Sequence, residues 1–179
     1  QRALEMENFK NQEADRLVVE SNVLKQSLAD EGVDRDKILV AHNAIDPDIF
    51  RPDEATRQQM RQQFDVAEDT ILAGYLGSYA FYHNTEILIR AADMLRDRKV
   101  RFLLIGDGLE LAACRELAAE LGVLEQNLFF LPRVMMDEVP KILCALDIAI
   151  LPGSTDIICP IKIQEYMASE TATIGPDYN

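Results

Sequence analysis

Short continuous apolar runs alternate with stretches of helical periodicity from about Leu72 to the end of the sequence. The runs, which predict strands, cover residues 71–76, 100–105, 128–131, 148–151 and 171–174. The stretches between them, which predict helices, cover 85–96, a segment after 108 that ends near 121, and segments beginning near 137 and at 160. Strands that are apolar at consecutive positions are buried on both faces, and strand–helix alternation predicts a parallel sheet. The predicted fold class is therefore α/β, a Rossmann-like parallel sheet with helices on both faces.

Glycine, proline and aspartate predict where these helices begin and end. Gly122 follows the second helix of this region and is a natural C-terminal cap. Asp137 is expected to cap the next helix, with Pro140 in its first turn. Pro160 is expected at the first position of the last helix, which proline favours.

The first 52 residues have a different pattern. Residues 17–19 and 38–40 predict two strands, and between them residues 22–31 predict a helix closed by Gly32. Residues 42–52 carry two prolines and several turn formers, which is typical of a linker. A short polar helix is then predicted over residues 57–64.

The charge of the chain excludes several classes of partner. Lys and Arg number 18 against 31 Asp and Glu, so the formal net charge is −13. No Lys/Arg cluster is present of the kind that neutralises nucleic-acid phosphates, and an anionic membrane surface would be repelled. A single phosphorylated ligand stays compatible with this charge, because backbone N–H groups and one or two cations can bind it locally.

The cysteines, the length of the apolar runs and the amino terminus together indicate a cytoplasmic protein. Cys114, Cys144 and Cys159 have no metal-ligand spacing and are expected to be reduced packing thiols. No apolar run approaches the roughly 18 residues of a membrane span, since Asp147 interrupts the best candidate. The acidic amino terminus is not that of a signal peptide. It lacks an initiator Met, so we expect the chain to begin in mid-protein.

Two of the loops that follow predicted strands begin with glycine. Residues 77–84 lead into a helix, and their backbone N–H groups could hold a diphosphate, with His83 as a further donor. Glycine after a strand also serves merely to permit a tight turn. Residues 106–108 form a Gly-x-Gly without the third glycine of a dinucleotide-binding loop, so no NAD site is predicted.

A third loop, residues 154–159, leads into the last predicted helix and has the strongest chemistry. Lys162 and Glu165 are three residues apart and share one helix face. The helix N-terminus and Lys162 favour phosphate, while Glu165, expected on the exposed surface, could accept hydrogen bonds from ribose hydroxyls. The alternative is an ordinary surface ion pair. The spacing alone does not decide between them.

Residues 160–168, read as Pro-x-Lys-x-x-Glu-Tyr-Met-Ala, resemble the PxKxxEYMA segment of the large family of retaining GT-B glycosyltransferases. Further segments resemble the same family in the same order along the chain: residues 14–21 its ADRVIVVS strand, 42–50 its PNGVDPERF hinge, 77–84 its GSxxxxHG loop, 104–108 its LIGDG turn and 131–134 its FLGRV stretch.

The resemblance implies the C-terminal half of a GT-B architecture. Residues 1–41 would be the tail of an N-terminal acceptor domain and 42–52 the interdomain linker. Residues 53–179 would be a nucleotide-sugar-binding domain that is truncated at its C-terminal end. Catalytic groups of the acceptor side lie in the other half of such enzymes, so no catalytic residue is assigned here. We expect no sugar transfer by this chain alone.

The resemblance also implies roles for individual residues. Glu165 matches the second glutamate of the family's E-x7-E motif, which binds the donor ribose. The remaining donor-binding residues are those expected beside the diphosphate and the nucleotide base: Gly77, Ser78, His83, Lys162, Arg133 and Val134. Ile157 stands where the first glutamate of the motif holds the donor sugar. The sugar-binding candidates are therefore its neighbours Asp156, Cys159 and Pro160.

The resemblance further implies a UDP- or GDP-sugar donor and a saccharide or lipid-linked acceptor, with retention at the anomeric carbon. The expected reaction uses no metal and no cofactor. The full-length protein would be cytoplasmic, with a peripheral position at the inner membrane face as an alternative. Strands 17–19 and 38–40 lack the rest of their domain here, so we expect self-association through the N-terminal segment.

Two alternatives to the transferase stay open. One is a sugar-nucleotide epimerase of the same fold, against which the EYMA and NAID segments, 165–168 and 43–46, argue. The other is a degenerate, non-catalytic module that binds a nucleotide sugar, which Ile157 at the glutamate position favours.

Overall fold

The computed structural model describes residues 2–155 and 157–177. Within this range the chain divides into two compact units. One comprises the residues up to 44 together with 155–160, and the other comprises 45–154 and 161 onward. The segment 155–160 therefore belongs with the first unit, although the chain on both sides of it belongs to the second.

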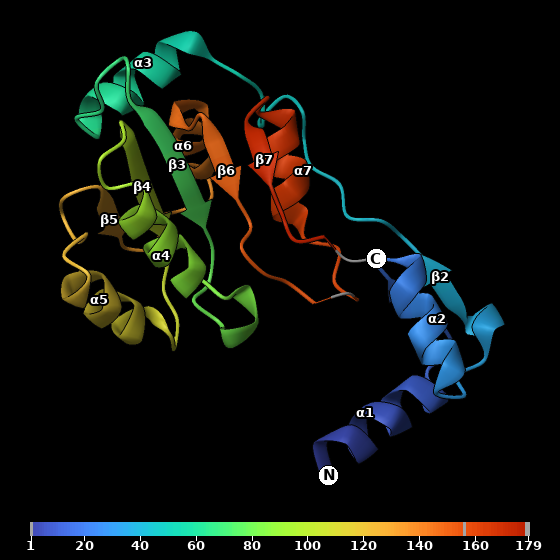
Figure 1. Cartoon of the computed structure of the whole chain (residues 1–179). Helices are drawn as coiled ribbons and strands as arrows, with labels where there is room; N and C mark the ends of the chain where they lie inside the picture. Colours follow the sequence, from blue (N-terminus) through green and yellow to red (C-terminus); the bar gives the residue numbers. More distant parts are fainter. Residues whose placement is uncertain (1, 156, 178–179) are drawn as a thin grey trace. The chain divides into compact units, whose positions relative to one another are not determined.

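The second unit is built on a parallel sheet with the strand order β5-β4-β3-β6-β7 (Figure 1). Its strands are β3 (Ile71–Leu76), β4 (Val100–Ile105), β5 (Leu128–Leu131), β6 (Ile148–Ile150) and β7 (Ala172–Ile174). From the central β3 the chain steps outward through β4 to β5, and then through β6 to β7 on the other side. The predicted α/β fold with a parallel sheet is confirmed. The strand order reverses between β3 and β6, which is where open α/β sheets bind ligands.

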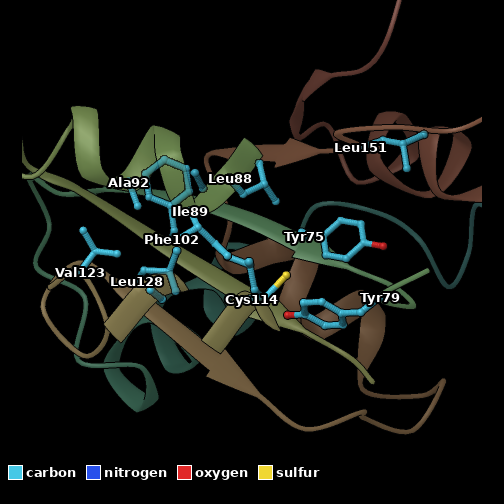
Figure 2. Close-up of a cluster of buried hydrophobic side chains, with 13 residues drawn as sticks. Tyr75, Tyr79, Leu88, Ile89, Ala92, Phe102, Cys114, Val123, Leu128 and Leu151 are labelled. Carbon is cyan, nitrogen blue, oxygen red and sulfur yellow. The ribbon is translucent and has the colours of Figure 1, made fainter. Parts of the chain in front are cut away.

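Helices cover both faces of this sheet. One face packs on α4 (Glu86–Met94) and α5 (Leu111–Glu120), and the other on α3 (Glu54–Gln63), α6 (Val139–Ala145) and α7 (Ile161–Ala168). Side chains of β4 alternate between the two cores, with Phe102 and Leu104 in the first and Leu103 and Ile105 in the second. Figure 2 shows the first core, in which Tyr75 and Tyr79 lie at one end. Burial on both faces explains why the strand runs are continuously apolar.

The polar helix α3 is held on the sheet by charged groups. Arg61 is 8% exposed and donates to Asp147 Oδ2 at 2.9 Å, as well as to three backbone carbonyl oxygens. Asp147, one residue before β6, also accepts a hydrogen bond of 2.7 Å from Leu72 N in β3. This network, together with Arg57 on the same carboxylate, ties α3 to the beginning of two neighbouring strands.

The first unit contains a two-stranded parallel sheet of β1 (Leu17–Val19) and β2 (Ile38–Val40), which are the two strands predicted from the sequence. They are joined by α2 (Asn22–Asp30) and the 3-10 turn η1 (Arg35–Lys37). Val19, Val33 and Ile38 form its small buried core. The other face of the sheet leaves Val18 and Leu39 exposed by 67% and 52%.

The helix α1 (Arg2–Glu13) was not expected. Its few apolar residues do not form a stripe along one face, so the hydrophobic pattern carries no helical period. Two helix starts also differ from expectation. Glu138, not Asp137, precedes α6, and its carboxylate accepts from Met135 N at 3.1 Å instead of capping the helix. α7 begins at Ile161, one residue after Pro160.

None of the helices in the described ranges is both long enough and apolar enough to cross a membrane. The cytoplasmic location stays a prediction.

Candidate functional site

A pocket of about 620 Å³ opens at the carboxyl ends of the parallel strands. It is bounded by the loops after β3, β4 and β5 and by the first turns of α7. These segments bring together most of the residues predicted to bind the nucleotide: Gly77, Ser78, Arg133, Val134, Lys162 and Glu165. Residues that the sequence did not single out complete its wall, among them Asp107 and Met136. The binding role of each residue stays a prediction.

The loops after β3 and β4 touch each other backbone to backbone. Gly106 has φ +146°, and a Cβ added there would lie 1.8 Å from the carbonyl oxygen of Gly77. A Cβ added at Gly108, with φ +153°, would lie 2.6 Å from Tyr79 N. Only glycine fits either position. The Gly-x-Gly of residues 106–108 therefore serves the close approach of two loops, a role that the motif alone did not indicate.

Backbone hydrogen bonds hold the first loop in place. Gly77 N donates to Ile105 O at 2.9 Å, and Tyr79 N donates to Asp107 O at 2.9 Å. Ser78 lies between these two anchors and is exposed in the pocket wall. Its position is therefore fixed by β4 and the loop after it, in addition to its own strand.

Lys162 is half-buried in the wall next to Gly77. A Cβ added at Gly77 would lie 2.7 Å from Lys162 Cε, so the lysine stem passes through the space that glycine leaves open. Burial lowers the pKa of Lys162, and the nearby Glu165 opposes that shift. A partly desolvated ammonium gains more from an anionic ligand than an exposed one does.

Glu165 is only 7% exposed, which corrects the expectation that it lies on the helix surface. Burial raises the pKa of Glu165, and the positive charge of Lys162 opposes that shift. Among the residues that the structure describes, its carboxylate accepts no hydrogen bond and forms no ion pair within 4.0 Å. A surface ion pair with Lys162 is therefore not what this spacing builds. An acidic residue that is largely buried, lines a pocket and has no partner among the described residues is a candidate ligand contact.

His83 is buried behind the pocket and is not part of its wall. It ends the 3-10 turn η2 (Phe81–His83), and its Nδ1 lies 2.9 Å from the carbonyl oxygen of Gly153. Because a carbonyl oxygen only accepts, Nδ1 carries the hydrogen of this bond. Burial lowers the pKa of His83, and Lys162 lowers it further, whereas the bond to Gly153 raises it.

None of the candidates for sugar binding that the structure describes is among the residues that line this pocket. Cys159 and Pro160 belong to the first unit, in which Asn43 Nδ2 donates to Cys159 O at 2.9 Å. Asp156 lies outside the described residues. Within the described ranges, His, Cys, Asp and Glu side chains do not gather in a group that could hold a metal ion.

The family model and the curated relatives that match this chain are all glycosyltransferases. A family model described as "Glycosyl transferases group 1" matches residues 70–179. A D-inositol 3-phosphate glycosyltransferase of Mycolicibacterium smegmatis is 31% identical over 150 residues, which are 80% of this chain and 33% of that protein. A 2-deoxystreptamine glucosyltransferase of Streptomyces kanamyceticus is 29% identical over 121 residues, 65% of this chain and 30% of its own length.

Among solved structures, HepE of Anabaena in complex with UDP and glucose superimposes with a TM-score of 0.83 at 21% identity. The match covers 94% of this chain and 46% of HepE. Such structural neighbours are GT-B glycosyltransferases. The chain spans about a third of the length of the curated relatives that it matches.

Proposed function

Since this chain belongs to the group 1 glycosyl transferases, we propose that its pocket binds the nucleoside diphosphate of a sugar donor. In the whole protein the bound sugar is then transferred to a saccharide or lipid-linked acceptor, with retention at the anomeric carbon and without a metal. UDP is the first candidate for the nucleotide, because HepE, a neighbour in fold, has been solved with UDP and with UDP-glucose. GDP is the alternative.

One observation carries the proposal. Glu165, a largely buried residue whose carboxylate has no hydrogen bond or ion pair among the described residues, lies in the same pocket as the partly desolvated Lys162 and the glycine loop of residues 77–78. Ribose hydroxyls are donors that a buried carboxylate lacks, and a diphosphate is the anion that Lys162 and Ser78 suit. A ligand that carries both a diphosphate and a ribose gives Lys162 and Glu165 a partner at the same time.

The division of roles follows from the positions of the side chains. Lys162 stands against the Gly77 loop at the carboxyl end of β3, and Glu165 follows one turn later in α7. Val134 and Met136 supply apolar surface for the base on the side that follows β5. Burial raises the pKa of Glu165, yet it must be ionised to accept from both ribose hydroxyls, and Lys162 favours that ionised form.

The test is a set of calorimetric titrations of the chain with UDP, GDP and uridine. Wild type should bind a nucleoside diphosphate more tightly than the nucleoside. Lys162→Ala should weaken UDP about 10- to 150-fold, the loss of one charge-assisted hydrogen bond, and should leave uridine nearly unchanged. The matched control is Lys141→Ala, at an exposed lysine of α6 away from the pocket. Absence of nucleotide binding by the wild type would refute the proposed function.

A non-catalytic module is the second candidate, because Ile157 stands where the resembled family carries its first glutamate. The whole protein would then bind the nucleotide but neither transfer nor hydrolyse the sugar. No observation on the described residues favours the epimerase.

A further inference from the structure

Tyr75 is a buried residue of β3 whose side chain contacts the loop of residues 77–79 from the core of the domain. It occupies the fifth position of β3, is 0% exposed, and its hydroxyl donates to the carbonyl oxygen of Ser78 at 2.6 Å. We propose that Tyr75 is a positioning residue for the diphosphate, acting through Ser78 and Lys162 without touching the ligand. This role rests on the proposed function of the pocket.

The hydroxyl of Tyr75 lies where the loop and the lysine meet. A Cβ added at Gly77 would be 2.6 Å from Tyr75 Oη and 2.7 Å from Lys162 Cε. Both groups therefore border the space that the missing side chain of Gly77 leaves empty. The lysine stem has the loop on one side and the buried phenol beside it, which restricts the rotamers that Lys162 can adopt.

The peptide between Ser78 and Tyr79 is fixed at both of its polar atoms. Its oxygen accepts from Tyr75 Oη, and its N–H donates to Asp107 O at 2.9 Å. The second bond is made by backbone alone, so Tyr75 is the side chain that sets the orientation of this peptide plane. Fixing this plane restricts the backbone of Ser78 and with it the position from which the Ser78 side chain lines the pocket. A loop oriented before the ligand arrives loses less entropy on binding.

The phenol is suited to this task because it stays protonated. Burial raises the pKa of Tyr75 well above its ordinary value of 10.0, so the hydroxyl remains a donor throughout the working range of pH. Its ring also packs edge-on against His83, with ring centroids 6.1 Å apart. One side chain therefore contacts both ends of the loop that leads from β3 to α4.

Tyr79 offers a matched control on the same loop. It is also 0% exposed, but among the described residues its hydroxyl has no hydrogen-bond partner. Figure 2 shows the two hydroxyls pointing in opposite directions, that of Tyr79 toward Cys114 and that of Tyr75 away from it. Loss of the Tyr79 hydroxyl should therefore leave the loop unchanged.

The experiment compares Tyr75→Phe with Tyr79→Phe by titration of the chain with UDP, UMP and uridine. Tyr75→Phe should weaken UDP about 5- to 20-fold, the effect of one lost hydrogen bond, and should leave uridine within about twofold of wild type. Tyr79→Phe should bind all three ligands as wild type does. A general loosening of the domain would instead weaken uridine and UDP alike, and that result would overturn the positioning role.

Gly77→Ala reaches the same contact from the other side and keeps the inference testable if Tyr75→Phe does not fold. The backbone at Gly77 has no positive φ, and the nearest atoms to the added methyl belong to the ends of two side chains, Tyr75 and Lys162. It should displace the phenol and Lys162 and produce the same selective loss of UDP. Unchanged UDP affinity in both variants would overturn the inference while leaving the proposed function intact. A wild-type chain that binds no UDP would overturn both.

Discussion

His83 Nδ1 lies 2.9 Å from the carbonyl oxygen of Gly153, so the loop after β3 is bonded to the segment after β6. The bond spans the place where the strand order reverses. A Cβ added at Gly153 would lie 2.6 Å from Tyr82 O, which explains why the two segments can approach so closely. The imidazole is therefore held as a neutral donor between two loops.

The burial of His83 predicts how the free energy of unfolding depends on pH. Burial lowers the pKa of His83 from its ordinary value of 6.5, so the unfolded chain binds the proton more readily than the folded one. The contribution of His83 to the free energy of unfolding is present above about pH 6.5 and is lost as pH falls through the lowered pKa. His83→Gln, whose amide can still donate to Gly153, should flatten the unfolding curve between about pH 7 and pH 5.

Urea denaturation across that pH range measures the effect. The chain has only two histidines, which makes His42→Gln the natural control, because His42 is exposed and in the first unit. This variant measures the effect of losing an imidazole outside the second unit. An unaltered slope in His83→Gln would contradict the assignment.

Glu165→Gln should separate binding from stability. The substitution removes a buried negative charge that accepts no hydrogen bond among the described residues, so the free chain should be as stable as wild type or more stable. Nucleotide binding should weaken about 10- to 150-fold, because a charged acceptor of ribose hydroxyls contributes about 1.5–3 kcal/mol. Unlike Lys162→Ala, it should weaken UDP and uridine alike.

Calorimetry with both ligands and a thermal melt of the free chain test this prediction together. Equal affinities for mutant and wild type would remove Glu165 from the site. A large loss of stability would show that the carboxylate has a structural partner.

Asp147→Asn should destabilise the second unit by about 2 kcal/mol at pH 7, because Arg61 is largely buried and loses its ionised partner. Burial opposes ionisation of Asp147, but hydrogen bonds from Leu72 N, Arg57 and Arg61 outweigh it and lower the pKa below 3.8. A carboxyl with a lowered pKa contributes stability above its unfolded pKa that is lost as pH falls. The gap between wild type and mutant should therefore narrow below about pH 4. Chemical denaturation at pH 7 and pH 3.5 checks this, with the exposed Asp97→Asn as control.

The outer face of the β1–β2 sheet predicts self-association. Val18 and Leu39 are neighbours in register there, and a two-stranded sheet has unpaired edges on both sides. Sedimentation velocity should show a concentration-dependent dimer that Val18→Lys with Leu39→Lys abolishes. Lysine at Met94, a more exposed apolar residue of α4, should leave it unchanged. A strict monomer at all concentrations would contradict the prediction.

The sheet could be predicted from the sequence because burial on both faces leaves a continuous apolar run, as in residues 102–105. The helix α1 could not, because its apolar residues follow no period. Lys162 and Glu165 were found from their spacing, but that spacing did not reveal that Glu165 is buried. Its burial depends on which face of α7 turns toward the sheet end. Tyr75 looked like any apolar strand residue, since its hydroxyl bond exists only once the chain has turned back at Gly77.

Backbone contact between Gly77 and Gly106 sets the spacing of two loops that line the pocket. A side chain at Gly106 would collide with the carbonyl oxygen of Gly77, whereas one at Gly77 would meet Tyr75 Oη and Lys162 Cε. Arg133 and Met136 stand on a separate loop after β5 and are exposed. Replacing either residue leaves the contact between Gly77 and Gly106 unchanged. If the base binds on this side, as proposed, nucleotide preference is expected to change through substitutions in the loop after β5.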